Sequence, residues 1–272
     1  MYTYKGISKE RCEYIRRIKR QKTLINVARI AVFAGIAALW EILAALNVID
    51  SFIMSSPSRI AATISGMVSN GLMHHIGVTC LETFIGFLLG TLLGTAIATL
   101  LWWNDFASGV MEPILVILNS LPKIALGPVI IIWAGAGMQA IIVVAIAISL
   151  IVTVLDMLSG FINTDAEKVR MVRSFGAGKR IIFTKVVFPS NLGTLFTLLK
   201  VNIGLSLVGV IAGEFLVSKA GLGYLIVYGG QVFQMDLVMS SVIILAVVAA
   251  LMYQAVALLE KYANRLLKFS TK

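Results

Sequence analysis

Long apolar runs, separated by short polar stretches, occupy most of the 272 residues of the chain. A helix that crosses a bilayer needs about 20 predominantly apolar residues. The runs that reach such a length are Leu24–Leu46, Val78–Leu101, Val110–Ala134, Met138–Leu158, Asn191–Val217 and Leu237–Leu259. Because backbone polar groups inside lipid need internal partners, the runs are predicted to be helices. The pattern therefore predicts an all-α integral membrane protein with about six transmembrane helices.

The third run, Val110–Ala134, differs from the others because it contains three prolines and a short polar group. Prolines inside a span free backbone groups that only protein or water can satisfy, and broken helices line substrate paths in transporters. Asn119, Ser120, Pro122 and Lys123 are therefore candidates for a translocation path. The alternative is a kinked packing helix whose lysine extends to a membrane interface.

Ionisable side chains inside the other apolar runs are costly in lipid, and each is a functional candidate for that reason. They are Glu41, Glu82, Lys200 and Glu214. Glu214, near the outer end of the fifth run, is the strongest of these candidates for the translocation path. The alternative is a carboxylate that is hydrated at the outer mouth or paired across helices. A pair with a base on another helix is one interpretation of Glu82, but the sequence alone assigns no partner to it.

Gly86, Gly90 and Gly94 recur every four residues in the second run. Residues at this spacing share one face of a helix, and small residues there let a neighbouring backbone approach closely. These glycines are therefore predicted to form a helix-packing face.

A polar, basic stretch at 159–189 interrupts the apolar pattern. Thr164 and Glu167 have the spacing of a capping box, which predicts the start of a helix. Gly176 can end that helix in a left-handed conformation, and a second helix is predicted over Lys179–Val187. The apolar residues of this helix–turn–helix would leave exposed surface without a partner, which argues against a merely solvated loop.

Composition and charge fix the class and suggest the topology. The chain is 59% hydrophobic and 13% charged, which excludes an ordinary soluble domain. Eight basic residues lie in the N-terminal segment, six in the polar stretch and four in the C-terminal tail. Cytoplasmic loops collect Lys and Arg, so the net charge of +10 is explained by topology in membrane lipid rather than by nucleic acid. Four predicted spans precede the polar stretch and two follow it. Because both numbers are even, the three basic clusters can all lie on the cytoplasmic side, which predicts that both termini are cytoplasmic.

Catalytic and metal-binding patterns are not evident. Cys12 and Cys80 offer neither a disulfide framework nor metal-ligand spacing. Gly178-Lys179 lacks the other residues of a phosphate loop. The sequence predicts no catalytic residue, metal site or cofactor.

The polar stretch resembles the cytoplasmic loop signature of binding-protein-dependent ABC importer permeases. The resemblance rests on Gly176-Ala177 and on Val186-Val187-Phe188-Pro189, with nine residues between Gly176 and Val186. Further segments resemble the sulfonate, nitrate and taurine branch of that family. They are Ser56-Pro57-Ser58, Gly86-Phe87, Leu121–Pro128, Ile132–Gly135 and Gly221–Tyr224. Two departures are evident: Arg170-Met171-Val172 replaces the usual Glu-Ala-Ala, and Glu82 stands where relatives often carry Arg.

The resemblance implies a non-catalytic permease subunit of the bacterial cytoplasmic membrane, powered by separate ATPase subunits and supplied by an extracytoplasmic substrate-binding protein. It implies a permease homodimer that imports a small polar solute, such as a sulfonate, nitrate, taurine or a vitamin precursor. The coupling-loop residues it marks are Arg170, Met171, Arg173, Ser174, Phe175, Gly176, Ala177, Phe183 and Pro189.

The expected domains are a basic cytoplasmic segment 1–23, a transmembrane permease domain 24–262 with its coupling loop at 159–189, and a cytoplasmic tail 263–272. The alternative function is a stand-alone secondary transporter, which would need coupling-ion carboxylates and an internal repeat.

Overall fold

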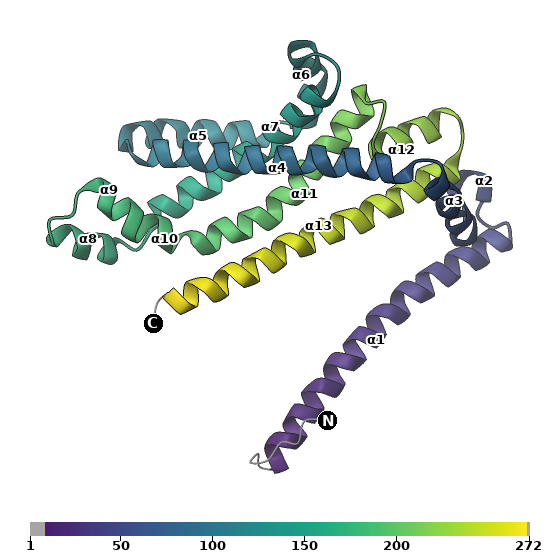
Figure 1. Cartoon of the computed structure of the whole chain (residues 1–272), viewed down its shortest axis with the longest axis horizontal. Helices are drawn as coiled ribbons and strands as arrows, with labels where there is room; N and C mark the ends of the chain where they lie inside the picture. The colour runs from purple at the N-terminus through teal and green to yellow at the C-terminus, as the bar shows by residue number, and fades with distance from the viewer. Residues whose placement is uncertain (1–8, 271–272) are drawn as a thin grey trace.

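The computed structural model describes residues 9–270, which fold as helices joined by short connections (Figure 1). The helices are α1 (Lys9–Ala45), α2 (Ser51–Met54), α3 (Pro57–Ser69), α4 (Leu72–Trp102), α5 (Asp105–Ser120), η1 (Lys123–Leu126), α6 (Gly127–Ala134), α7 (Met138–Ile162), α8 (Ala166–Ser174), α9 (Lys179–Ile182), η2 (Phe183–Val187), α10 (Phe188–Ser190), α11 (Leu192–Val217), α12 (Leu222–Gln231) and α13 (Met235–Ser270). Within the described residues there is no β-strand, so the all-α prediction is confirmed.

Five single helices, α1, α4, α7, α11 and α13, are long and apolar enough to cross a membrane. The third apolar run is different, because α5 and the η1–α6 segment meet at an angle of 84°. Together they would make a sixth, broken span. The run Val110–Ala134, for which the sequence left a broken and a kinked helix open, therefore consists of two helical pieces joined at Leu121–Pro122. Leu121 is extended, at φ −69° and ψ 141°, as expected for a residue before proline.

Helices α4, α7 and α11 form the centre of the bundle and pack against one another. The glycines at 86, 90 and 94 lie where α4 meets α7. A Cβ atom added to Gly86 would lie 2.6 Å from the Cβ of Ala145, and one added to Gly90 would lie 2.0 Å from the Oγ of Ser149. A Cβ atom on Gly209 of α11 would lie 2.6 Å from the Cα of the same Ala145. The three helix backbones therefore approach closely at Ala145.

Helix α1 extends away from this bundle (Figure 1) and is mostly exposed along its span. It meets α3 at its C-terminal end. There the carboxylate of Glu41 accepts hydrogen bonds from the backbone N and the Oγ of Ser58, at 3.0 and 2.8 Å. Ser58 lies in the first turn of α3, so Glu41 caps the N-terminus of that helix.

The helices α8 to α10 cluster at one end of the bundle, which we call the loop end (Figure 1). Helices α2, α3 and α12 lie at the opposite end (Figure 1). The polar stretch and the α11–α12 connection therefore lie at different ends of the molecule.

Candidate functional site

The polar stretch folds as the predicted helix–turn–helix, but its first cap differs from the prediction. Asp165 is the N-cap of α8, and its Oδ1 accepts a hydrogen bond from the backbone N of Glu167 at 3.0 Å. The hydroxyl of Thr164 is occupied elsewhere, because it donates to the carbonyl of Gly160 and accepts from the Nδ2 of Asn191, at 3.1 and 2.9 Å. Thr164 thus connects the end of α7 to the start of α11.

Gly176 makes the turn between the two loop helices. Its φ of +80° lies in the left-handed region that favours glycine, and its backbone N donates to the carbonyl of Arg173 at 2.9 Å. A Cβ atom added here would meet nothing within 4 Å. The backbone conformation, rather than lack of space, therefore calls for glycine at this position.

The second loop helix is longer than predicted, because α9, η2 and α10 follow one another from Lys179 to Ser190 without a break. The η2 segment, Phe183–Val187, is a turn of π-helix. Pro189 follows it and has no N–H to donate to a preceding carbonyl. A π-turn is one way in which a helix accommodates a backbone hydrogen bond that is missing at a proline.

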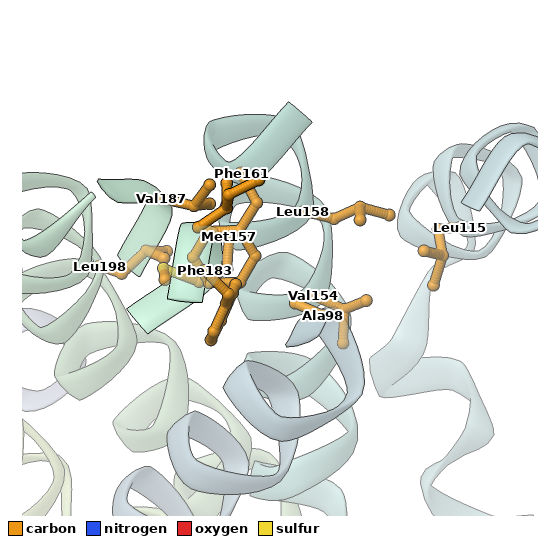
Figure 2. Close-up of a cluster of buried hydrophobic side chains, with 10 residues drawn as sticks. Ala98, Leu115, Val154, Met157, Leu158, Phe161, Phe183, Val187 and Leu198 are labelled. Atoms are coloured by element: carbon orange, nitrogen blue, oxygen red, sulfur yellow. The ribbon is translucent and has the colours of Figure 1, made fainter. Parts of the chain in front are cut away.

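An aromatic cluster fixes the loop to the bundle. The ring of Phe183, which is 8% exposed, lies 5.0 Å from Trp102, 5.3 Å from Trp103 and 5.3 Å from Phe161 between centroids. Figure 2 shows Phe183 directed at Phe161 and Met157 in this buried cluster. Aromatic pairs at such distances add to the free energy of burial. The base of the loop is therefore packed tightly against the ends of α4 and α7.

The tip of the loop is exposed. Phe175 is 82% and Met171 is 58% exposed, although both are large apolar side chains. The other exposed residues among the sequence candidates are Arg170, Arg173, Ser174, Gly176 and Pro189, while Ala177 is half-buried. The loop therefore presents an apolar and basic tip on a packed base, which suits contact with another protein.

Four translocation-path candidates, Asn119, Ser120, Pro122 and Lys123, lie together at the break between α5 and η1. The Nζ of Lys123 donates to the carbonyl and to the Oδ1 of Asn119, at 2.9 and 3.0 Å. A cation there neutralises carbonyls at the C-terminal end of α5. Lys123 thus stabilises the end of a broken helix.

Glu214, the fifth candidate, lies in a different environment. Its side chain is buried, and it accepts hydrogen bonds from the Oγ1 of Thr79 at 2.7 Å and from the backbone N of Gly223. Within residues 9–270 its side-chain partners belong to α4 and α12 rather than to the break. A Cβ atom on Gly221 would collide with the Glu214 carboxyl group, so this turn is built around the carboxylate.

Glu82, whose partner the sequence left open, forms no ion pair with a base within residues 9–270. It is 2% exposed, and its charged neighbour is Glu214 of α11. Lys200 forms an ion pair with Glu260 of α13 at 2.9 Å instead.

Sequence reasoning missed Asn202, a buried residue of α11. Its Nδ2 donates to the hydroxyls of Thr91 on α4 and Thr153 on α7, at 2.9 and 2.7 Å. It therefore links three helices. An uncharged amide in a long apolar run is a weak signal, although hydrogen bonds of this kind between helices are common in membranes.

Comparison with known proteins agrees with this architecture. Residues 86–268 match the family described as binding-protein-dependent transport system inner membrane component. The putative aliphatic sulfonates transport permease protein SsuC of Bacillus subtilis is 25% identical over 258 residues, which cover 94% of this chain and 93% of the relative. The formylaminopyrimidine transport permease protein ThiX of Halalkalibacterium halodurans is 26% identical over 192 residues, which cover 71% of this chain and 76% of the relative.

A solved structure of the MetNI methionine ABC transporter in an inward-facing conformation has a chain with the same fold. The TM-score is 0.63 at 19% identity, and the match covers 70% of this chain and 95% of that chain. The family match extends over more than half of the sequence and includes α7, the loop and α11. The chain is therefore a member of the family of binding-protein-dependent inner membrane transport components, a multi-pass permease subunit of an ABC transporter.

Proposed function

We propose that two copies of this chain form the translocation path for a small polar solute and that separate ATPase subunits drive it through the loop 159–189. An extracytoplasmic binding protein would deliver the solute, as the family description implies. The subunit itself would hydrolyse no ATP. Family membership favours this function over a stand-alone secondary transporter.

The observation that supports the coupling role is an exposed tip on a packed base. Phe175 has no covering partner within the described chain, and it lies beside the turn at Gly176. Displacement of the tip by an ATPase would pass through Phe183 to α4 and α7, and through the Asn191–Thr164 hydrogen bond to α11. The loop therefore has the mechanical connections that a coupling element needs.

Replacing Phe175 by alanine tests the docking contact. Because the side chain is 82% exposed, we expect Phe175→Ala to leave folding intact but to reduce ATPase copurification and solute uptake. Phe106→Ala is the matched control, since Phe106 is 81% exposed but lies outside the loop, on α5. Equal uptake and equal ATPase binding in wild type and Phe175→Ala would contradict the docking role.

Gly176→Asp tests the turn. We expect normal membrane insertion but ATP hydrolysis that is uncoupled from uptake, because aspartate is strained at a φ of +80° and adds charge to the tip. Gly178→Asp is the control: Gly178 has a φ of −73° at the N-cap of α9, where aspartate is a preferred residue. Normal coupled transport by Gly176→Asp would refute the proposal. Equal losses in both variants would assign the effect to charge rather than to the turn.

The solute class rests on the named relatives, which are described as permeases for aliphatic sulfonates and for formylaminopyrimidine. We propose a sulfonate, nitrate, taurine or vitamin-precursor solute, and a path that passes the broken helix at Asn119, Ser120, Pro122 and Lys123. Thermal-shift screening of the partner binding protein against these four classes tests the solute. Reduced uptake by Lys123→Met, with ATPase binding retained, would support the path; unchanged uptake would exclude Lys123 from it.

The proposed topology places both termini, including the basic segment 1–23 and the tail 263–272, in the cytoplasm of a bacterial cell. The clusters of basic residues at both ends support it. Cys12 provides the test in a Cys80→Ser background. A membrane-impermeant maleimide should label Cys12 only after the cell membrane is opened, and labelling of intact spheroplasts would overturn this orientation. Light scattering of the purified protein in detergent tests the proposed homodimer.

A further inference from the structure

Two buried carboxyl groups meet in the half of the bundle that is remote from the loop. Glu82 of α4 and Glu214 of α11 are 2% and 1% exposed. They are neighbours across the helix contact, because the hydroxyl of Thr79, one turn before Glu82 on α4, donates to Glu214 at 2.7 Å. Helix α12 begins beside them, since the backbone N of Gly223 donates to Glu214. The pair therefore lies where three helices join.

The surroundings of Glu214 suit an ionised carboxylate. Its oxygens accept hydrogen bonds from the hydroxyl of Thr79 and from the backbone N–H group of Gly223. Backbone N–H groups at a helix N-terminus favour a negative charge, and every one of these partners is a donor. Glu214 thus acts as the cap of α12.

The surroundings of Glu82 suit the opposite state. Its Oε2 is buried and has no hydrogen-bond partner in the described part of the chain. A neutral carboxylic acid tolerates such a position better than a carboxylate does. In residues 9–270 no lysine or arginine lies within ion-pair distance of either carboxyl group. Two adjacent carboxylates in such a dry site repel strongly, so both cannot be ionised together.

The other titratable groups on the packed elements do not supply a counter-charge. On α4 the Nδ1 of His75 accepts from the backbone N of Gly221 at 3.1 Å, and its ring stacks on Tyr224 of α12. Cys80, also on α4, is half-buried. The only acid of α7 is Asp156, near the loop end. On α13, Asp236 and Glu260 are paired with arginine and lysine.

We propose that Glu82 and Glu214 form a binding site for a single proton, which Glu82 carries and donates to Glu214. A metal ion or Na⁺ suits the site less well, because hard cations need about six oxygen ligands. Here Thr79 already donates to Glu214 and accepts from the backbone N of Leu222 at 2.8 Å. The shared proton links α4 to α11 as an ion pair would. It leaves Glu214 charged, so Glu214 can accept the hydrogen bond from the backbone N of Gly223 at the start of α12.

Infrared spectroscopy of the full-length protein in lipid nanodiscs tests the proton directly. A protonated carboxylic acid has a C=O stretching band that shifts in D₂O and that ionised carboxylates lack. We expect this band in the wild type at neutral pH, and its loss in Glu82→Gln. Glu112→Gln, which changes an exposed acid on α5, should retain the band. A wild-type spectrum without the band, or an unchanged band in Glu82→Gln, would overturn the proposal.

Thermal unfolding from about pH 6 to about pH 10 provides a second test. A proton bound more tightly in the folded state stabilises at low pH, so the wild-type Tm should fall as the pH rises. Glu82→Gln keeps a hydrogen-bond donor at this position but removes the titratable proton. Glu82→Arg supplies a fixed cation beside Glu214. In both variants the fall in Tm should be smaller than in wild type. The same fall in all three proteins would refute the proposal. A rise in wild-type Tm with Na⁺ over K⁺, absent in Glu82→Gln, would identify a cation site instead and would also refute it.

Discussion

Replacing Gly209 by alanine tests the close contact of three helices at Ala145. The new Cβ atom would lie 2.6 Å from the Cα and 3.1 Å from the N of Ala145, which are backbone atoms that cannot rotate away. Carbon atoms prefer separations of about 3.5–4.0 Å, so α7 and α11 must separate by roughly 1 Å. Helix α7 is also held by α4, since a Cβ atom on Gly86 would lie 2.6 Å from the Cβ of the same Ala145. Overpacking of this kind typically costs about 1–3 kcal/mol.

Gly204→Ala isolates this cost. Gly204 is exposed on the same helix, and a Cβ atom there meets nothing within 4 Å. In both variants the replacement of a helical glycine by alanine raises the free energy of unfolding by about 0.5–1 kcal/mol. The difference in stability between the two variants therefore reports the collision alone. Unfolding in mixed micelles with increasing sodium dodecyl sulfate measures that difference. We expect Gly209→Ala to be less stable than Gly204→Ala by about 1–3 kcal/mol. Equal midpoints would show that the helices do not approach as closely as described.

The remaining predictions concern polar and aromatic contacts between helices. Asn202→Ala should lower the free energy of unfolding in the same titration by about 1–3 kcal/mol, because it removes two interhelical hydrogen bonds; an unchanged midpoint would count against them. Lys200→Met should destabilise by about 1–3 kcal/mol by leaving Glu260 without its cation, and the double variant with Glu260→Leu should recover much of the loss. If the double variant is no better than the single one, the pair is not coupled. Phe183→Ala should cost about 3–5 kcal/mol, with faster hydrogen exchange confined to the loop 159–189; uniform exchange along the chain would contradict a local anchor.

The apolar pattern predicted the fold class because the length of a membrane helix depends on local composition. It could not predict the 84° angle of the broken span, which depends on how α6 packs against α7 and α11. The loop cap shows the same limit on a smaller scale. Thr164 and Asp165 both suit an N-cap, and the choice falls on Asp165 because Asn191, distant in sequence, holds the threonine hydroxyl.

The carboxyl groups illustrate why partners could not be read from the sequence. An acid inside an apolar run indicates that a partner exists, but the identity of that partner depends on the rotation of two helices about their axes. A base was one possible partner of Glu82, but Glu82 faces Glu214, while Lys200 faces Glu260. The glycine spacing at 86, 90 and 94 was informative for a different reason, since small residues in register describe a surface on one helix alone.

The junction of α4, α7 and α11 has a mechanical consequence. Close backbone contacts at Ala145 and the hydrogen bonds of Asn202 leave these three helices little freedom to slide, because packed interiors resist small displacements. A displacement of the loop 159–189 should therefore rotate α4, α7 and α11 together as one rigid body. The bending must then fall on segments without helical hydrogen bonds, and Leu121–Pro122 is such a segment. We expect this dipeptide to serve as the hinge about which the broken span changes its angle during transport.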